Sequence, residues 1–479
     1  MNGQCMNSEL MTLYVDLDGT LVKTDLLLES AWSLIRQNPL RLFQVLWWRL
    51  SGKAALKAEI ASRVSVAAAN LPYNKVFVEW LRLQAANGRQ LVLASASNQR
   101  LAYSVAAHLG IFSAVIASNN DQNLAGAAKL RAIQRHAEDR PWVYAANARV
   151  DVDVWRGAAG AVVVNPGRGV EAAARQVTRV EAVFATRSHA PLVWLEALRL
   201  HQWLKNLLTF VPLLTSFALG EGRAVLAAMI AFVAFGLVAS ATYLFNDLND
   251  LDADRRHARK RHRALAAGDI SIVAGASASV VLLATGLLVG SLLPAQFMVS
   301  LLAYLLGTVA YSLHLKRLML LDVICLAGLY TVRIIAGALA IGVSVSNWLL
   351  AFSVFLFLSL ALIKRCAELV ALQADQQPSA HGRDYRSTDL PVFMAMGICA
   401  AFMSVLVLAL YVDASSTLAQ YSHPRLLWLL SPLILYWIGR LWVKTARGEM
   451  HDDPLVYSLR DRTSWLCFVV MVTVATVSR

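Results

Sequence analysis

The second half of the chain is built from repeated apolar runs, which constrain the fold more than any other feature of the sequence. Each run is roughly twenty residues long, the length that crosses a bilayer as a helix. About nine runs lie near 203–219, 224–245, 271–292, 296–314, 320–342, 347–363, 391–412, 425–442 and 464–478. The sequence therefore predicts an all-α integral membrane domain of about nine transmembrane helices, preceded by a soluble domain with ordinary charge.

The formal net charge of +13 at pH 7 is explained by membrane topology. An excess of Lys and Arg marks the cytoplasmic loops of membrane proteins. With the N-terminal domain inside the cell, the inside segments hold 255–263, Lys316–Arg317, Lys364–Arg365 with Arg383 and Arg386, and Arg440 through Arg462. The opposite loops hold almost no Lys or Arg. We therefore expect a multi-pass protein of the inner cell membrane with a cytoplasmic N-terminal domain, and no nucleic-acid partner.

The cysteines and the N-terminus argue against two further classes of protein. The five cysteines are scattered without a CxxC pair, so neither disulfides nor a cysteine-based metal site are expected. The N-terminal stretch MNGQCMNSELMTLYVDLDGT lacks a basic start followed by an apolar core. We therefore expect no cleaved signal peptide.

In the first half, polar residues follow short apolar runs that have the character of buried strands. The run Leu13–Val15 ends in DLDGT at 16–20, and the runs at 90–94, 142–145 and 161–164 each lead to polar residues. Two acids spaced i, i+2 after a strand suit a nucleophile and an acid/base beside a bound cation. Strands that alternate with helical stretches predict a parallel, Rossmann-like α/β sheet with its site at the carboxyl ends of the strands.

These motifs together resemble the haloacid dehalogenase (HAD) superfamily of phosphohydrolases over about residues 11–170. The resemblance implies that Asp16 is the nucleophile and Asp18 the general acid/base. It implies that Ser95 and Lys129 hold the phosphate, and that Asp151 joins Asp16 and Asp18 in binding Mg²⁺.

Two features qualify this resemblance. Residues 21–85 are predicted to be helical and would form a small cap over the site. Trp47 and Trp48 would lie in the core of this cap or contact the membrane. The family usually has a Gly-Asp pair where this chain has Ala146 and Asn147, so the metal site loses one charge. Two hypotheses follow for this domain: an active phosphatase, or an inactive docking or regulatory module.

The stretch YLFNDLNDLDADRRHARKRHR presents acids directly after an apolar run. On a helix, Asp247, Asp250 and Asp254 share one face with Asn246 at its edge, whereas Asp252 points away. Carboxylates that converge at a membrane boundary repel one another, and oxygen ligands suit Mg²⁺ that bridges to phosphates. We therefore expect a metal–diphosphate site. A solvated acidic–basic loop is the alternative, but it leaves the one-faced acids unexplained.

The pattern Asn-Asp-x-x-Asp-x-x-x-Asp resembles the first aspartate-rich motif of the UbiA superfamily of intramembrane prenyltransferases, over about residues 190–479. The resemblance implies nine transmembrane helices and a cytoplasmic-side active site. The stretches RLHQWLKN at 199–206, YSLHLKRLMLLD at 311–322 and RIIAG at 333–337 are similar to the branch containing decaprenyl-phosphate phosphoribosyltransferase. Those enzymes transfer 5-phosphoribose from phosphoribosyl diphosphate to a polyprenyl phosphate.

Aromatic prenyltransferases of this superfamily usually carry a second Asp cluster, and here that place reads LIKRCAELVALQADQQPSAHGRDYR. This basic segment suits two anionic substrates, a diphosphate donor and a polyprenyl phosphate, because Arg and Lys bind phosphates. Candidate phosphate-binding residues are Lys205, Asn206, Lys260, Arg261, Arg263, Arg333, Lys364 and Arg365. Topology anchoring is the alternative role for Lys364 and Arg365. Ala264 and Cys366 depart from the branch pattern without removing a charged group.

Three functions are compatible with an expected division into domains 1–185 and 186–479. The first is a Mg²⁺-dependent phosphoribosyltransferase whose fused HAD domain dephosphorylates the product. The second is an aromatic prenyltransferase that makes quinone or haem precursors. The third is a transporter or scaffold with an inactive HAD domain.

A short loop near the C-terminus contains His451, Asp452 and Asp453. These residues either cap the loop or contact the substrate.

Overall fold

The computed structural model describes residues 11–50, 52–64, 66–119, 122–185, 190–257, 259–374, 384–414, 421–450 and 453–479. The chain forms two compact units, Met1–Ala197 with Leu244–Ser277, and Leu198–Tyr243 with Ala278–Arg479. The expected division into 1–185 and 186–479 differs from these units in two respects, the first being that the first unit continues to Ala197. The second is that the aspartate-rich stretch, within Leu244–Ser277, groups with the N-terminal residues rather than with the membrane helices.

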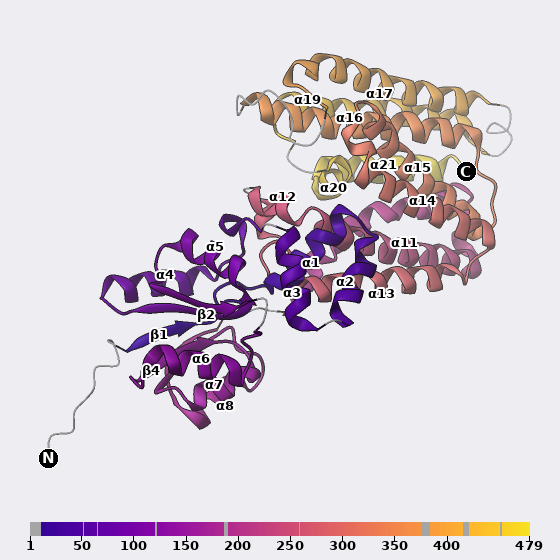
Figure 1. Ribbon diagram of the computed structural model, residues 1–479. Coiled ribbons are helices and arrows are strands. Elements are labelled where there is room, and N and C mark those ends of the chain that lie inside the picture. The colour runs from indigo at the N-terminus through magenta and orange to yellow at the C-terminus, as the bar shows by residue number, and fades with distance from the viewer. Residues whose placement is uncertain are drawn as a thin grey trace. The chain divides into compact units, whose positions relative to one another are not determined.

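A six-stranded parallel sheet organises the first unit (Figure 1). Its strands are β1 (Thr12–Val15), β2 (Leu91–Asn98), β3 (Ala114–Ser118), β4 (Trp142–Ala146), β5 (Gly160–Val164) and β6 (Arg179–Phe184). In space they follow the order β3-β2-β1-β4-β5-β6, so the winding reverses at β1. Ligands of such sheets bind beside this reversal, at the carboxyl ends of the strands. The predicted Rossmann-like fold is confirmed, and Asp16 directly follows β1.

Helices cover both faces of the sheet, because successive strand residues point to opposite sides. Leu13 and Val15 belong to a core shared with α4 (Lys75–Ala86) and α5 (Gln99–Leu109). Tyr14 belongs to the other core. That core includes side chains of α6 (Ala127–Ala137), α7 (Val152–Arg156) and α8 (Val170–Val177). The strands are thus buried on both faces, which explains their continuous apolar sequences.

Three helices between β1 and α4 form a small cap with a core of its own. They are α1 (Leu26–Gln37), α2 (Arg41–Leu50) and α3 (Lys53–Arg63), and their core contains Leu34, Leu56, Ile60 and Val64. Trp48 packs partly against this core, whereas Trp47 is 70% exposed. The remaining elements of the unit are η2 (Ala68–Asn70), η3 (Arg149–Asp151), α9 (Ala190–Ala197), α12 (Leu251–Arg256) and η6 (Lys260–His262).

The second unit is a bundle of long apolar helices that run alongside one another (Figure 1). Its elements begin with η4 (Leu200–Phe210), α10 (Val211–Thr215), η5 (Ala218–Gly220), α11 (Gly222–Asn249), α13 (Ile272–Gly290), α14 (Ala295–Leu313) and η7 (Leu315–Arg317). They continue with α15 (Leu321–Ile341), α16 (Asn347–Ala374), η8 (Ser387–Asp389), α17 (Leu390–Asp413), η9 (Pro424–Leu429), α19 (Leu430–Ala446), α20 (Pro454–Arg460) and α21 (Arg462–Val477). α11 ends, and α13 begins, among residues of the first unit.

Seven helices in the described part of the chain are long and apolar enough to cross a membrane, so this is a multi-pass membrane protein. The prediction of about nine spans is not confirmed. The run at 203–219 forms η4 and the five-residue α10 instead of one long helix. The run at 464–478 forms α21, which is shorter than the seven candidate spans.

Glycine allows two elements of the bundle to approach closely. Gly337 of α15 lies against Thr209 of η4, and a Cβ atom at this position would collide with the Thr209 carbonyl group. Gly328 on the same helix has open space around it. Membrane helices gain van der Waals contact where small residues let backbones approach. Gly337 therefore determines how closely η4 packs against α15.

We expect Gly337→Ala to destabilise the protein by about 1–3 kcal/mol, because the added methyl group meets backbone that cannot rotate away. The matched control Gly328→Ala should be neutral or stabilising by up to about 1 kcal/mol, since alanine favours helix. Thermal unfolding of the purified chain in detergent measures both. Equal midpoints for the two variants would contradict the close approach.

Candidate active sites

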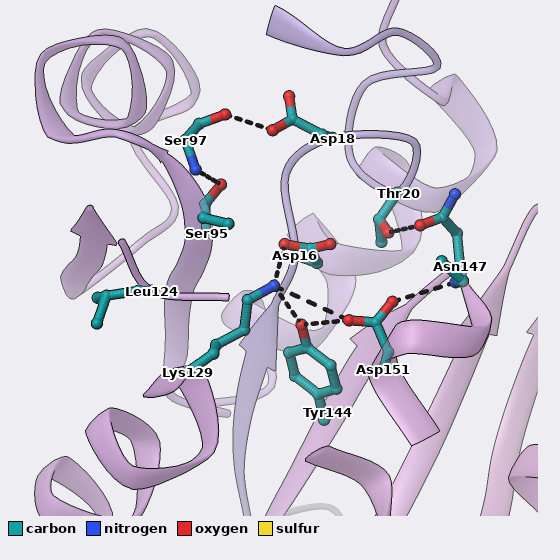
Figure 2. A network of polar contacts seen from close by, with 12 residues as sticks. Asp16, Asp18, Thr20, Ser95, Ser97, Leu124, Lys129, Tyr144, Asn147 and Asp151 are labelled. Carbon is teal, nitrogen blue, oxygen red and sulfur yellow. Dashed lines mark hydrogen bonds and ion pairs between the residues drawn. The ribbon is translucent and has the colours of Figure 1, made fainter. Parts of the chain in front are cut away.

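β1 places Asp16 in a buried network of charges at the end of the sheet (Figure 2). Lys129 Nζ on α6 donates hydrogen bonds of 2.8 Å to both Asp16 Oδ1 and the Tyr144 hydroxyl. Lys129 Nζ also lies 3.9 Å from Asp151 Oδ1, to which the Tyr144 hydroxyl donates at 3.2 Å. A single ammonium group therefore balances two buried carboxylates from different elements.

Burial sets the electrostatics of this network. It raises the pKa of Asp151 to about 6, and nearby Asp16 adds to the rise while Lys129 opposes it. Burial alone would lower the pKa of Lys129, but Asp16 and Asp151 outweigh it and the pKa is raised. Lys129 therefore keeps its charge, and the site keeps a fixed cation next to Asp16.

Asp18 is oriented away from this network, toward the first turn of α1 (Figure 2). Its Oδ1 accepts from the Leu26 amide at 2.9 Å, and its Oδ2 accepts from the Ser97 hydroxyl. The Ser97 amide in turn donates to Ser95 Oγ at 3.0 Å. Burial, followed by the charge of Asp25, raises the pKa of Asp18 to about 7. Ser97 therefore links two predicted site residues, Asp18 and Ser95.

Sequence reasoning missed Ser97 and Tyr144 as members of the site. The predicted strand ends at residue 94, whereas β2 continues to Asn98 and includes Ser97. The one signal for Ser97 in the sequence is its position two residues after Ser95. Tyr144 sits inside the apolar run of β4 and shows no polar pattern. Only the packing of α6 on that face reveals that its hydroxyl bridges Lys129 and Asp151.

Asn147, the departure from the family pattern, packs against the turn that follows Asp18. The Thr20 hydroxyl donates to Asn147 Oδ1 at 3.4 Å. Gly19 adopts φ of +74° at this turn, and a Cβ there would collide with the Asn147 side chain. The amide therefore has a packing role beside the site.

The carboxylates of this site are suitable ligands for Mg²⁺, which binds through one or two carboxylates plus waters and substrate phosphates. Asp16 and Asp151 both lie at Lys129 and supply two such carboxylates. No group of three or more His, Cys, Asp or Glu side chains suited to a metal occurs among the described residues. A phosphate ligand would have to complete the coordination.

The aspartate-rich stretch lies where α11 passes into α12. The Asp250 amide donates to the Asn246 carbonyl and the Asp254 amide to the Asp250 carbonyl, both at 2.8 Å, so the helical path continues through the junction. Arg263 Nη1 donates to Asp247 Oδ1 at 3.1 Å and to Asp254 Oδ2 at 2.6 Å. Asp247 and Asp254 thus share one side of this path and one cation.

Burial distinguishes the members of this stretch. Asp247 and Asp254 are buried, whereas Asp250 and Asn246 are half-buried. Burial raises the pKa of Asp254, and the positive charge of Arg263 makes this rise smaller. Two converging carboxylates again match the needs of Mg²⁺ bound to a diphosphate. Lys260 and Arg261 are exposed beside them.

The second unit holds a basic cluster around Asp453. Asp453 Oδ2 accepts from Lys205 Nζ at 2.7 Å and Lys364 Nζ at 3.5 Å, and from the Tyr330 hydroxyl at 3.2 Å. Burial would raise the pKa of Asp453, but the two lysines lower it far below its usual range. Asp453 also accepts from the Leu455 amide as the N-cap of α20. The loop-cap interpretation is confirmed for Asp453, while His451 and Asp452 lie outside the described residues.

Arg333 is buried in α15 beside this cluster. Its guanidinium donates to Asn206 Oδ1 at 2.9 Å and to the Tyr304 hydroxyl at 3.0 Å, and lies 5.6 Å from the centre of the Tyr330 ring. Asn206 is fully buried, and its Nδ2 has no hydrogen-bond partner among the described residues. Within the described ranges, the acceptors of Arg333, including the Leu329 carbonyl, are all neutral, and none of them is a carboxylate.

Arg365 has a different environment from the other predicted phosphate-binding residues. It is 1% exposed and donates to Asp322 Oδ2 at 2.5 Å, to Glu368 Oε2 at 2.6 Å and to the Tyr311 hydroxyl at 2.9 Å. These bonds tie α14, α15 and α16 together. The geometry gives Arg365 a packing role in the bundle.

Comparison with known proteins identifies both halves. Residues 209–467 match the UbiA prenyltransferase family, and residues 13–156 match the haloacid dehalogenase-like hydrolases. The chain belongs to the UbiA prenyltransferase family. It is therefore a transferase, and this UbiA-family protein carries a HAD-like domain at its N-terminus.

Three relatives show how widely this arrangement extends. Uncharacterized protein y4nM of Sinorhizobium fredii is 37% identical over 95% of this chain and 88% of its own length, so it shares both halves. Nodulation protein NoeC of Azorhizobium caulinodans is 36% identical over 58% of this chain and 90% of its own length. Decaprenyl-phosphate phosphoribosyltransferase of Mycolicibacterium smegmatis is 29% identical over 58% of this chain and 89% of its own length.

Removal of the shared cation should destabilise the HAD-like domain of this UbiA-family protein. Lys129→Met leaves Asp16 and Asp151 buried and unpaired, which costs about 3–5 kcal/mol. Arg156→Met is the matched control, because the Arg156–Asp153 pair is 66% and 62% exposed and such pairs contribute at most about 1 kcal/mol. The urea concentration at which protease cleaves half of the N-terminal domain measures both. Equal shifts in the two variants would refute the buried-charge account.

Proposed function

We propose that the protein transfers 5-phosphoribose from phosphoribosyl diphosphate to a polyprenyl phosphate at the cytoplasmic face of the cell membrane. The observation that carries this proposal is the charge balance of the basic cluster. Among the residues that the structure describes, Lys205 and Lys364 pair with one carboxylate, Asp453. Arg333 lies over the ring of Tyr330, whose hydroxyl donates to the same carboxylate. A cluster with excess positive charge suits a phosphate on the acceptor, whereas an aromatic acceptor carries no phosphate. The name of the Mycolicibacterium smegmatis relative supports the same substrates.

The diphosphate donor is assigned to the aspartate-rich stretch. Asp247, Asp250 and Asp254 would hold Mg²⁺, with Asn246 at the edge of the set. Bound there, Mg²⁺ would neutralise charge that grows on the leaving diphosphate. Arg263, which now balances two of the acids, has a fork of further N–H donors for phosphate oxygens. Lys260 and Arg261 are exposed next to it and add positive charge for the leaving group.

The lipid phosphate is assigned to the basic cluster. Lys205 and Lys364 supply ammonium groups. Arg333 supplies a guanidinium group that, in the described part of the chain, donates only to neutral acceptors. The unpaired Nδ2 of Asn206 is a donor of the kind that a phosphate oxygen satisfies. In the reaction, the anomeric C–O bond to diphosphate breaks and a phosphate oxygen of the lipid bonds to the same carbon. The products are the phosphoribosyl lipid and free diphosphate.

The HAD-like domain is assigned the next step, removal of the 5-phosphate from the product. Asp16 would attack phosphorus and take up the phosphoryl group, which water then releases. Lys129 stays charged next to Asp16 and would bind the phosphate oxygens, together with Ser95. Asp18 would give the proton that the departing 5-oxygen needs, and Asp151 would help Asp16 and Asp18 to hold Mg²⁺.

Asp250→Asn should reduce formation of phosphoribosyl lipid by at least about a hundredfold, since it removes a charge that holds the metal with its diphosphate. The control Asp252→Asn changes an acid two positions away that is 50% exposed and pairs with Arg36, and it should keep activity within about fivefold. The assay uses purified full-length protein in detergent, Mg²⁺, radiolabelled phosphoribosyl diphosphate and polyprenyl phosphate. Label in the organic phase is counted. Absence of lipid-linked label with wild-type protein that still binds Mg²⁺ and diphosphate would overturn the proposal.

Asp16→Asn should leave the transfer step intact but abolish release of inorganic phosphate from the lipid product, because the amide cannot act as the nucleophile. The same extracts give both readouts, with lipid label counted in the organic phase and phosphate in the aqueous phase. Phosphate release that persists in Asp16→Asn would show that the HAD-like domain is not the phosphatase.

A further inference from the structure

The cap helix α1 holds the aspartate-rich stretch through a buried ion pair and further polar contacts within the first unit. Glu29 and Arg255 form a two-pronged ion pair with N–O distances of 2.5 and 2.6 Å, and their side chains are 4% and 6% exposed. One turn later, Trp32 Nε1 donates to the Leu248 carbonyl at 2.8 Å. Another turn on, Arg36 donates to the Asn249 carbonyl at 2.7 Å. Arg36 also pairs with Asp252, but this pair is exposed and contributes little.

These contacts fall on the residues between the metal-binding acids. Leu248 and Asn249 separate Asp247 from Asp250, and Arg255 directly follows Asp254. A carbonyl group at the end of a helix has no partner within that helix, so α1 supplies the donors that the end of α11 needs. Asp252, which is predicted to point away from the shared face, is 50% exposed and pairs with Arg36.

Arg255 also connects α1 to the loop that carries Arg263, the cation that bonds Asp247 and Asp254. Its Nε donates to the Ala266 carbonyl at 3.1 Å while its Nη atoms bond Glu29. Ala266 lies three residues after Arg263, the residue that bonds both Asp247 and Asp254. Glu29 thus orients Arg255, and Arg255 fixes the loop that carries Arg263.

The same helix begins at the HAD-like site. The Leu26 amide in its first turn donates to Asp18 at 2.9 Å. From Leu26 to Gln37 the helix is about 18 Å long at 1.5 Å per residue. One rigid element therefore touches an acid of one site at its start and the backbone of the other site along its length.

We infer that α1 is a positioning element for the transferase site, and that Glu29, through Arg255, sets the geometry in which the aspartate-rich stretch binds a metal–diphosphate. This inference rests on the proposed assignment of that stretch to the diphosphate. It adds a second task for the HAD-like domain, one that does not depend on its hydrolytic activity. Groups that orient metal ligands typically change affinity or activity by about 10–100-fold when removed.

Glu29→Gln in the full-length protein tests this inference, because it removes the charge and keeps the shape. We expect amides of residues 244–257 to exchange hydrogen faster by mass spectrometry. We also expect the affinity for inorganic pyrophosphate in the presence of Mg²⁺, measured by calorimetry, to fall by about tenfold or more. The control is Glu59→Gln on α3, where the Glu59–Arg63 pair is 43% and 44% exposed and both readouts should stay at wild-type values.

Two further variants separate positioning from loss of folding. Trp32→Phe removes only the hydrogen bond to Leu248 and should give a smaller change in the same direction. Glu29→Arg combined with Arg255→Glu should restore part of the pyrophosphate affinity. Wild-type exchange and affinity in both Glu29→Gln and Trp32→Phe would overturn the inference. Wild-type protein that binds Mg²⁺ and pyrophosphate in this Glu29-dependent way but makes no phosphoribosyl lipid would refute only the proposed function.

Discussion

The cost of removing carboxylates from water governs this structure. An unpaired buried charge destabilises a protein by several kcal/mol, and each buried acid of the two candidate sites is placed against a cation or a set of donors. The pairings are Asp16 and Asp151 with Lys129, Asp247 and Asp254 with Arg263, Asp453 with Lys205 and Lys364, and Glu29 with Arg255. Each pairing joins elements that are separate in the sequence, so the charges also define where those elements meet.

The ratio of acids to cations then distinguishes what each site can bind. Two acids that share one cation leave carboxylate oxygens for a metal, as at Lys129 and Arg263. Among the described residues, the Asp453 cluster has the opposite balance, with two lysines on one carboxylate, as the proposed binding of a phosphate requires. The ratio alone is insufficient, because Arg365 also meets two acids. Both oxygens of Asp322 are bonded there, one to Arg365 and one to the Tyr385 hydroxyl, so that cluster is complete without a ligand.

The sequence predicts those parts of the structure that depend on local pattern. Apolar runs identify four of the six strands, all except β3 and β6, and the seven candidate spans. The i, i+3, i+7 spacing places Asp247 and Asp254 on one side. The run at 203–219 fails because hydropathy does not report the 3₁₀ geometry of η4, which Gly337 accommodates from far along the chain. Glu29 and Arg255 could not be paired in advance either, since 226 positions separate them. The role of Tyr144 could not be predicted from the sequence either, because the packing of α6 on the sheet decides which strand residue contacts Lys129.

The contacts of α1 also bear on the Asn147 departure. Asn147 packs at the Gly19–Thr20 turn and has no part in the bonds from Glu29, Trp32 and Arg36. A change at residue 147 can therefore weaken metal binding in the HAD-like site without altering how α1 holds the aspartate-rich stretch. The two tasks place separate demands on the same domain. Positioning requires the fold, the cap and α1, whereas hydrolysis also requires Asp16 as the nucleophile and Asp18 as the proton donor.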